Sequence, residues 1–132
     1  MKKTLSIAFG IILVILIGAL TLTGTPDDAA TSGTGISSNV SLQNGVQYVV
    51  INARGGYSPR TSTIQPGIPT KLVMKTNNTY DCSSALVIRS VGYRSMLPPD
   101  GETIIDLGTP KTGSKIQGLC SMGMYSFTLN VS

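Results

Sequence analysis

Three sulfur-bearing side chains lie close together near the C-terminus, in the segment GLCSMGM that covers residues 118–124. Cys120, Met122 and Met124 occupy alternate positions, with glycines before and between them. Thiolates and thioethers are soft ligands, which favour Cu(I) over hard cations and over zinc, whose sites usually combine cysteine with histidine or other cysteines. Because methionine is neutral, a methionine-rich ligand set suits the monovalent cuprous ion. The segment therefore indicates soft-metal chemistry.

The backbone between these sulfurs must bend before they can share a metal ion. Residues i and i+2 of a regular strand point the same way but lie about 7 Å apart. Gly118 and Gly123 relieve this constraint, because glycine adopts backbone angles that other residues avoid and lets the loop curl. The second cysteine, Cys82, begins the stretch CSSALVIRS and has to reach the loop from another strand. We expect a metal site formed by Cys82, Cys120, Met122 and Met124.

The rest of the composition excludes several functions. The chain contains no histidine, so it has no histidine-based triad, no histidine-ligated zinc and no blue-copper site with two imidazoles. Its six acidic side chains are scattered and form no acid pair, so we expect no enzyme. The formal net charge is only +4, two charges of which come from Lys2 and Lys3, and no basic cluster with interleaved aromatics indicates nucleic-acid binding.

Two other interpretations of the sulfur atoms remain open. The two cysteines are an even pair, so a structural disulfide between Cys82 and Cys120 would explain them in an exported chain, and it could coexist with a metal site if the pair oxidises when metal is absent. A disulfide leaves Met122 and Met124 unexplained. Met96, in the loop RSMLPP, is either an additional thioether near the site or a partly exposed packing residue.

The N-terminal segment predicts a membrane anchor or an export signal. Residues 1–4 carry Lys2 and Lys3, and residues 5–23 contain no ionisable side chain. As a helix these 19 residues would span roughly 28 Å, close to the hydrocarbon thickness of a bilayer. We expect a single-pass helix in the cell membrane, with a cleaved signal peptide as the alternative. Either way the lysines stay cytoplasmic and the remainder lies on the extracytoplasmic face, exported if the leader is cleaved. Residues 24–39 are rich in Gly, Ser and Thr and predict a flexible linker.

Residues 40–132 predict one small all-β domain. Short β-rich runs alternate with Gly, Pro and Asn turn signals at a spacing typical of a Greek-key β-sandwich. The expected strands are Val46–Ala53, Thr70–Thr76, Ala85–Val91, Glu102–Gly108 and Tyr125–Val131. In the last of them Phe127, Leu129 and Val131 fall on one face, and Met74 is expected in the core from the alternation of its own strand.

The stretch from Gln47 to Val131 resembles a cupredoxin domain. The resemblance rests on the ordered elements GGYSP, IQPGIPTKLVM, YDCSSALVI, MLPPDGETIIDLGTPKTG and LCSMGMYSF. Blue-copper cupredoxins carry histidine at the strand start and Cys, His and Met in the last loop, whereas this chain has Cys82 followed by Cys120, Met122 and Met124. That pattern is similar to membrane-anchored cupredoxin-fold Cu(I) chaperones of bacterial copper resistance, and to cupredoxin domains attached to copper-exporting P-type ATPases.

The resemblance implies a function without catalysis. Cys82 and Cys120 would be thiolates able to bridge two cuprous ions, and Met122 and Met124 would be outer thioether ligands. The expected cargo is one or two Cu(I) ions. The implied role is a membrane-tethered copper chaperone or buffer that delivers Cu(I) to a copper-exporting P-type ATPase or another copper protein. Two alternatives remain: an electron-transfer cupredoxin with an atypical ligand set, which the missing imidazoles oppose, and a disulfide-stabilised exported β-sandwich without metal.

Overall fold

The computed structural model of the chain describes residues 36–132. The expected membrane anchor or signal at residues 5–23 and most of the expected linker lie outside the described residues. Within residues 36–132, the structure contains no helix with the length and apolar character needed to cross a bilayer.

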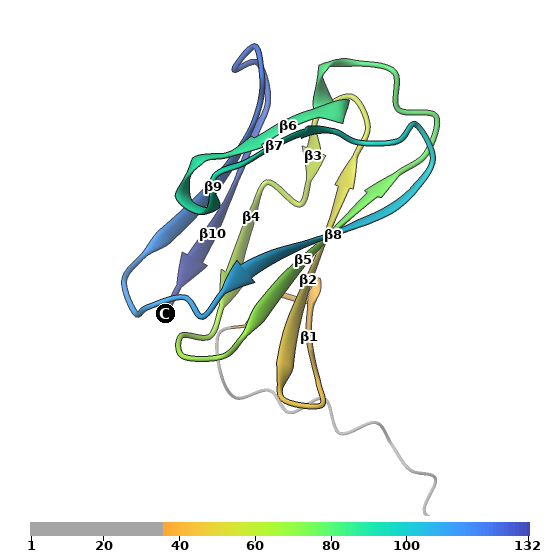
Figure 1. Cartoon of the computed structure of the whole chain (residues 1–132). Coiled ribbons are helices and arrows are strands. Elements are labelled where there is room, and N and C mark those ends of the chain that lie inside the picture. The colour runs from red at the N-terminus through yellow and green to blue at the C-terminus, as the bar shows by residue number, and fades with distance from the viewer. Residues whose placement is uncertain (1–35) are drawn as a thin grey trace, which may run out of the picture. The chain divides into compact units, whose positions relative to one another are not determined.

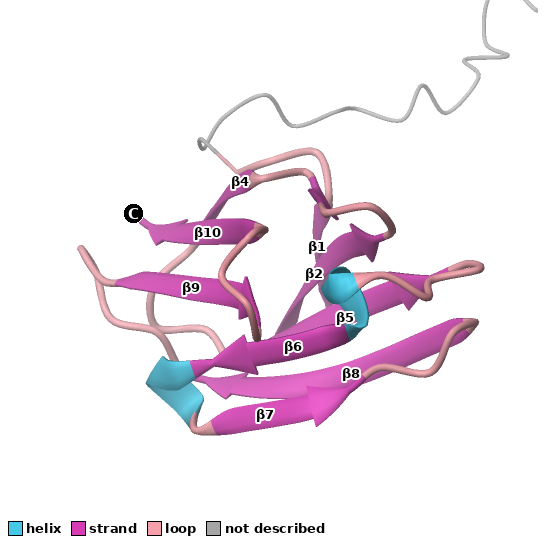
Figure 2. Cartoon of the chain, turned by 90° about the horizontal axis from the view of Figure 1, so that it is seen from above, coloured by secondary structure: helices cyan, strands magenta, loops and turns pink. Residues whose placement is uncertain are grey.

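Two five-stranded sheets pack face to face (Figure 2). The first has the order β1-β2-β5-β8, with β3 on the edge of β2, and comprises β1 (Val40–Gln43), β2 (Val46–Ala53), β3 (Tyr57–Ser58), β5 (Thr70–Thr76) and β8 (Gly101–Gly108). The second has the order β4-β10-β9-β6-β7 and comprises β4 (Thr61–Ile64), β6 (Ala85–Ile88), β7 (Tyr93–Met96), β9 (Lys115–Cys120) and β10 (Ser126–Val131). The all-β prediction is therefore confirmed for the described part of the chain.

The core lies between the sheets and follows the period of two that the strands require. In β10, Phe127, Leu129 and Val131 are buried, as their alternation predicts. Met74 in β5 is fully buried, which confirms its predicted place in the core. Each large apolar side chain buried in this way contributes about 1.5–3 kcal/mol, which is how a small sandwich offsets the entropy of ordering its strands.

The segment after Cys82 departs from the expected strand. Cys82–Ser84 form a 3-10 turn, η1, so Cys82 precedes β6 instead of beginning a strand. The expected strand Ala85–Val91 ends at Ile88, because Arg89–Val91 form a second 3-10 turn, η2, which closes on Gly92 at a φ of 66°. Glycine readily adopts a positive φ, whereas a β-branched residue such as Val91 does not. The chain therefore turns at Gly92 before the next strand begins.

Five short strands were not predicted from the sequence. β1, β3, β4, β7 and β9 are two to six residues long, and most lack a sustained alternation of apolar and polar residues. The domain also begins before Val40, because Ser37 and Asn39 are hydrogen-bonded to it. The Asn39 side-chain amide donates to the carbonyl of Val50 and to the hydroxyl of Ser62, both at 2.9 Å.

The topology brings two distant segments to one end of the sandwich. The loop between β9 and β10 and the turn η1 lie at the same end, and the C-terminus lies at the other (Figure 1). β6, which follows η1, pairs with β9 so that Leu86 lies opposite Cys120. The amide of Ser121 extends this pairing by donating to the carbonyl of Ala85 at 2.8 Å.

Candidate metal centre

Asp81 holds the turn that carries Cys82. Its carboxylate accepts hydrogen bonds from the amide and the hydroxyl of Ser83, and from the amide of Gly55 at 2.8 Å. It therefore caps η1 and ties this turn to the loop after β2. The hydroxyl of Ser83, followed by these amides, lowers the pKa of the Asp81 carboxyl below its ordinary value.

We predict that Asp81→Ala loosens the cysteine-bearing turn. Loss of a capping side chain costs about 1 kcal/mol, which corresponds to a fall of about 4–8 °C in Tm for a domain of this size. Because Cys82 follows directly, Cu(I) affinity should fall by about 10–100-fold, as it does when a residue that orients a ligand is removed. Thermal denaturation and competitive Cu(I) titration measure the two effects.

The matched control is Asp106→Ala. Asp106 also caps a backbone amide, that of Gly108 at 2.8 Å, but at the far end of β8. This variant removes the same charge and should leave Cu(I) affinity unchanged. Equal losses of affinity in the two variants would contradict a positioning role for Asp81.

A tight turn presents Cys120. The Gly123 amide donates to the Cys120 carbonyl at 2.8 Å, and the Cys120 amide donates to the Tyr125 carbonyl at 3.0 Å. Gly123 has a φ of 73°, so it supplies the left-handed conformation that lets the loop curl, as the sequence predicts. The sulfur of Cys120 also accepts a hydrogen bond from the Tyr125 amide at 3.4 Å, within the turn.

The two cysteines meet as free thiols. Cys82 is half-buried and Cys120 is 1% exposed, and the two thiols lie near enough for each to shift the pKa of the other. Residues separated by 37 intervening positions in the chain are thus brought together at one end of the core. A shared soft-metal site requires this proximity of its two thiolates.

The surroundings shift the pKa values of the two thiols in opposite directions. Donation to Cys120 raises the pKa of the Cys82 thiol, although the Met122 amide acts in the opposite direction. Burial by itself raises the pKa of Cys120, but hydrogen-bond donors outweigh burial and lower it below its ordinary value. Those donors are the Cys82 thiol and the amides of Tyr125, Met122 and Met124. Cys120 is therefore the more readily ionised of the pair.

Met122 and Met124 are exposed beside the cysteines. Their side chains are 76% and 66% exposed, so neither fills the core. Apolar side chains that are exposed together, as these two are, mark interaction or ligand sites more often than single exposed ones do. Met96 is 68% exposed, so little of it packs, and it pairs with Ala85 next to η1.

Gly118 has a different role from the predicted one. It lies inside β9, not in the loop, and its φ is not in the left-handed region. A Cβ atom at this position would approach two ring carbons of Phe127 to 2.2 Å. Gly118 therefore makes room for the Phe127 ring, which packs edge-on against Tyr57 with ring centroids 5.2 Å apart.

Tyr57 helps to hold the turn that carries Cys82, a role that the sequence did not indicate. Its hydroxyl donates to the carbonyl of Ser83 at 3.0 Å, directly beneath the turn that carries Cys82. Burial, with the neighbouring thiols and Asp81, raises the pKa of this phenol far above its ordinary value. The phenol therefore stays protonated and keeps donating to the turn. Its place in GGYSP gave no sign of this contact, because the partner lies 26 residues away.

The available donors suit a soft cation. Among residues 36–132, no three His, Cys, Asp or Glu side chains gather closely enough to hold a metal ion. The cysteine pair and the two loop methionines instead offer four sulfur atoms at one end of the domain. Thiolate and thioether donors fit Cu(I) and are poor ligands for hard divalent ions.

The fold and this cluster define a class of protein: a small cupredoxin-like β-sandwich with a sulfur-rich end. Its structural neighbours include copper-binding domains, which confirms the resemblance that the sequence indicates. No protein-family model matches the chain, and no curated protein matches its sequence.

Two solved structures illustrate the likeness, and a third resembles this chain only distantly. The metal-binding domain of the Cu(I)-exporting P-type ATPase CopA from Streptococcus pneumoniae D39, solved with Cu(I), is 26% identical with a TM-score of 0.64, over 76% of this chain and 99% of that domain. A copper-binding protein solved by NMR in the apo form is 21% identical with a TM-score of 0.64, over 75% of this chain and 100% of that one. Dithionite-reduced auracyanin from Roseiflexus castenholzii is a weaker match, 14% identical with a TM-score of 0.43, over 69% of this chain and 99% of that one.

Proposed function

We propose that this protein binds Cu(I) through Cys82, Cys120, Met122 and Met124 and acts as a copper chaperone or buffer, without catalysis. The observation that carries the proposal is the proximity of two free thiols from distant segments, beside two exposed methionines. The likeness to a Cu(I)-binding domain that is 26% identical supports copper as the cargo.

The four sulfur atoms have different accessibilities, which suits stepwise transfer of the ion. Cys120 is buried and surrounded by amide donors, so its thiolate would be the fixed anchor for one or two cuprous ions. Met122 and Met124 lie outside and are neutral, so they would be the weaker ligands, released first when an acceptor's sulfur arrives. Ligand replacement of this kind needs no acid, base or redox partner.

The proposed cellular setting follows from the N-terminal segment. Residues 5–23 would anchor the chain in the cell membrane as a single helix, and the linker between this helix and Ser37 would tether the domain on the extracytoplasmic face. A cleaved leader would release the same domain. The acceptor would be a copper-exporting P-type ATPase or another copper protein.

We expect the reduced full chain to bind one or two Cu(I) ions without visible colour. An anaerobic titration against a chromophoric Cu(I) competitor counts the ions, and an absorbance spectrum after adding Cu(II) provides the contrast. Thioethers hold Cu(II) poorly, so no intense visible band should form. A strong visible band would support the electron-transfer alternative instead. Failure to compete for Cu(I) would leave the metal-free sandwich as the correct description.

A further inference from the structure

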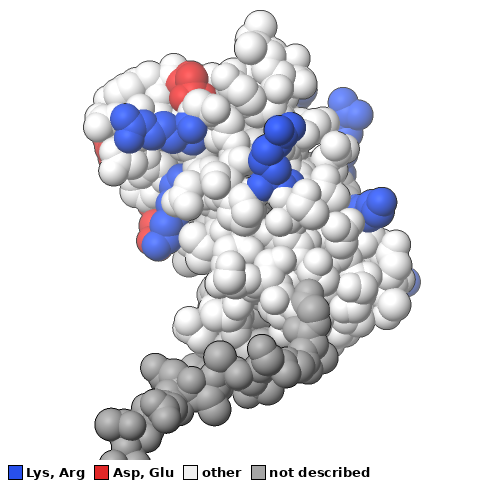
Figure 3. Space-filling model, turned by 180° about the vertical axis from the view of Figure 1, so that it is seen from behind, with Lys and Arg blue, Asp and Glu red and all other residues white. Residues whose placement is uncertain are grey.

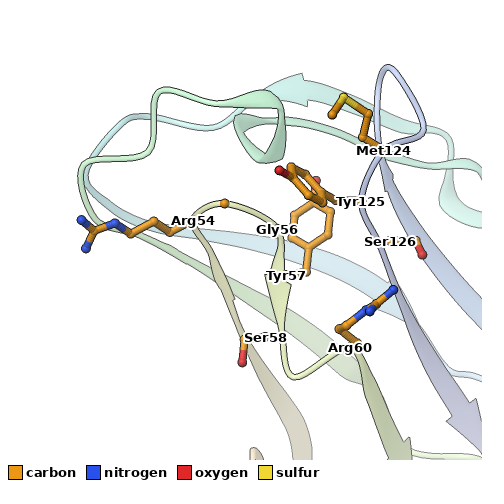
Figure 4. A pocket seen from close by; sticks show the side chains of 9 residues that line it. Arg54, Gly56, Tyr57, Ser58, Arg60, Met124, Tyr125 and Ser126 are labelled. Carbon is orange, nitrogen blue, oxygen red and sulfur yellow. The ribbon is translucent and has the colours of Figure 1, made fainter.

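The exposed methionines lie between two hollows that each contain a pair of arginines. The first hollow, of about 380 Å³, has Arg54, Arg60, Met124 and Tyr125 among its lining residues. Figure 4 shows that Arg60 reaches toward Ser126 while Arg54 extends away from it, so the two guanidinium groups do not converge on one small ligand. The two guanidinium groups lie apart at the edge of the hollow, which suits contact with an extended charged surface.

The second hollow lies on another side of the same loop. It encloses about 270 Å³ and is lined by Arg89 and Arg94 together with Cys120, Met122 and Gly123. Arg89 belongs to η2 and Arg94 to β7, so this pair comes from a different part of the chain from the first. We call Met122, Met124 and the two hollows the methionine face.

The arginines of the methionine face are exposed and form no ion pair within the described residues, where the single salt bridge joins Lys75 to Glu102. The four acidic side chains of residues 36–132 all have partners. Asp81 accepts from the amide of Gly55, which lines the first hollow, whereas Asp100 and Asp106 accept from other backbone amides and Glu102 pairs with Lys75. No acidic side chain lines either hollow. Figure 3 shows the same imbalance on the rear surface, where basic side chains outnumber acidic ones.

We infer that the methionine face is a docking surface for an acidic protein that presents its own sulfur ligands, so that carboxylates meet Arg54, Arg60, Arg89 and Arg94 while Cu(I) passes at the centre. This inference rests on the proposed function. Arginine pairs with carboxylates through two parallel hydrogen bonds, which fixes orientation as well as attraction. Complementary charge at the rim mainly raises the association rate.

A protein fits this surface better than a lipid bilayer does. The apolar side chains at its centre are thioethers next to two thiols, which match the ligands of a copper acceptor. No tryptophan occurs in the chain, and Tyr80 is the single largely exposed aromatic side chain among residues 36–132 that could lie at a membrane interface. The lipid alternative is included in the test.

The test uses two synthetic acceptor peptides that each contain a Cys-x-x-Cys motif, one flanked by four glutamates and the other by four glutamines. Cu(I)-loaded full chain is mixed with each peptide in a stopped-flow instrument. We expect transfer to the acidic peptide to be about 10-fold faster at low salt, because opposite charges steer the encounter. This advantage should vanish near 1 M salt, where the screening length is only about 3 Å.

Charge-matched variants locate the effect. R54Q/R60Q and R89Q/R94Q should each reduce the acidic-peptide advantage about 3-fold, since half of the steering charge is removed. K111Q/K115Q removes the same net charge near the start of β9, whereas Cys120 ends that strand, so this variant should keep the full advantage. The Cu(I) affinity of each variant is first measured against the competitor. This step distinguishes a change in metal binding from a change in docking to the peptide.

The possible outcomes are distinct. If the wild-type chain takes up no Cu(I), the proposed function fails and the docking inference fails with it. If loading is normal but the arginine and lysine variants behave alike, only the docking inference is wrong. If the wild-type chain binds phosphatidylglycerol vesicles more tightly than neutral phosphatidylcholine vesicles, the arginine variants lose this difference, and the acidic peptide has no advantage, the face binds lipid and the inference is overturned.

Discussion

Cys120→Ser should reduce Cu(I) affinity by more than about 100-fold, since loss of a ligand exceeds the 10–100-fold cost of losing a residue that merely orients one. The hydroxyl is a hard donor with a far higher pKa than the thiol, so it cannot replace a thiolate toward a soft cation. Cys82→Ser should have a similar effect, because the two thiols would hold the ion together. Competitive titration under reducing conditions measures both losses.

Met124→Leu provides the graded comparison. It removes a single thioether while keeping the size of the side chain, so affinity should fall but remain measurable. Since Met124 is 66% exposed, thermal stability should change by no more than about 0.5 kcal/mol. Cu(I) uptake at full strength in both cysteine variants would show that the sulfur pair is not the metal site.

Gly118→Ala should destabilise the whole domain, although it adds only one methyl group. The new Cβ atom would lie 2.2 Å from two ring carbons of Phe127, which is 1% exposed and has nowhere to move. Overpacking of this kind costs about 3 kcal/mol, and the expected fall in Tm exceeds about 10 °C. Thermal denaturation followed by circular dichroism measures the effect.

The compensating change is Phe127→Leu. A smaller side chain leaves space for the added methyl group, so the double variant should be more stable than the sum of the two single losses by about 1–2 kcal/mol, a coupling typical of residues in contact. Additive losses would show that the Phe127 ring is not what excludes a side chain at residue 118.

The sequence predicts the long strands because their apolar residues alternate. Phe127, Leu129 and Val131 occupy the core as their spacing requires, and Met74 does so as well. The turn at Cys82–Ser84 could not be predicted, because its cap is a side chain whose third hydrogen bond reaches Gly55, 26 residues away. Local patterns carry information about periodicity, but they carry little about contacts between distant segments.

The candidate site shows the same division. The residue types and the glycine at position 123 indicate the sulfur-bearing loop from its own sequence, and the structure places Cys82 against it. Tyr57 was missed, because its contact with the carbonyl of Ser83 depends on β3 lying beneath η1 in the folded chain. Gly118 was predicted to let the loop curl, but it instead leaves space for the ring of Phe127. This role depends on the position of Phe127 in the folded chain.

The two thiols lie close together in a domain whose core is formed by apolar side chains packed between the two sheets. Many small metal domains gain their fold only when the metal arrives, so that their affinity includes the free energy of folding. In this protein the two quantities are separable, and an ion that leaves would leave behind an ordered scaffold instead of an unfolded chain. A carrier built in this way can be emptied and refilled repeatedly without passing through states that aggregate or are degraded.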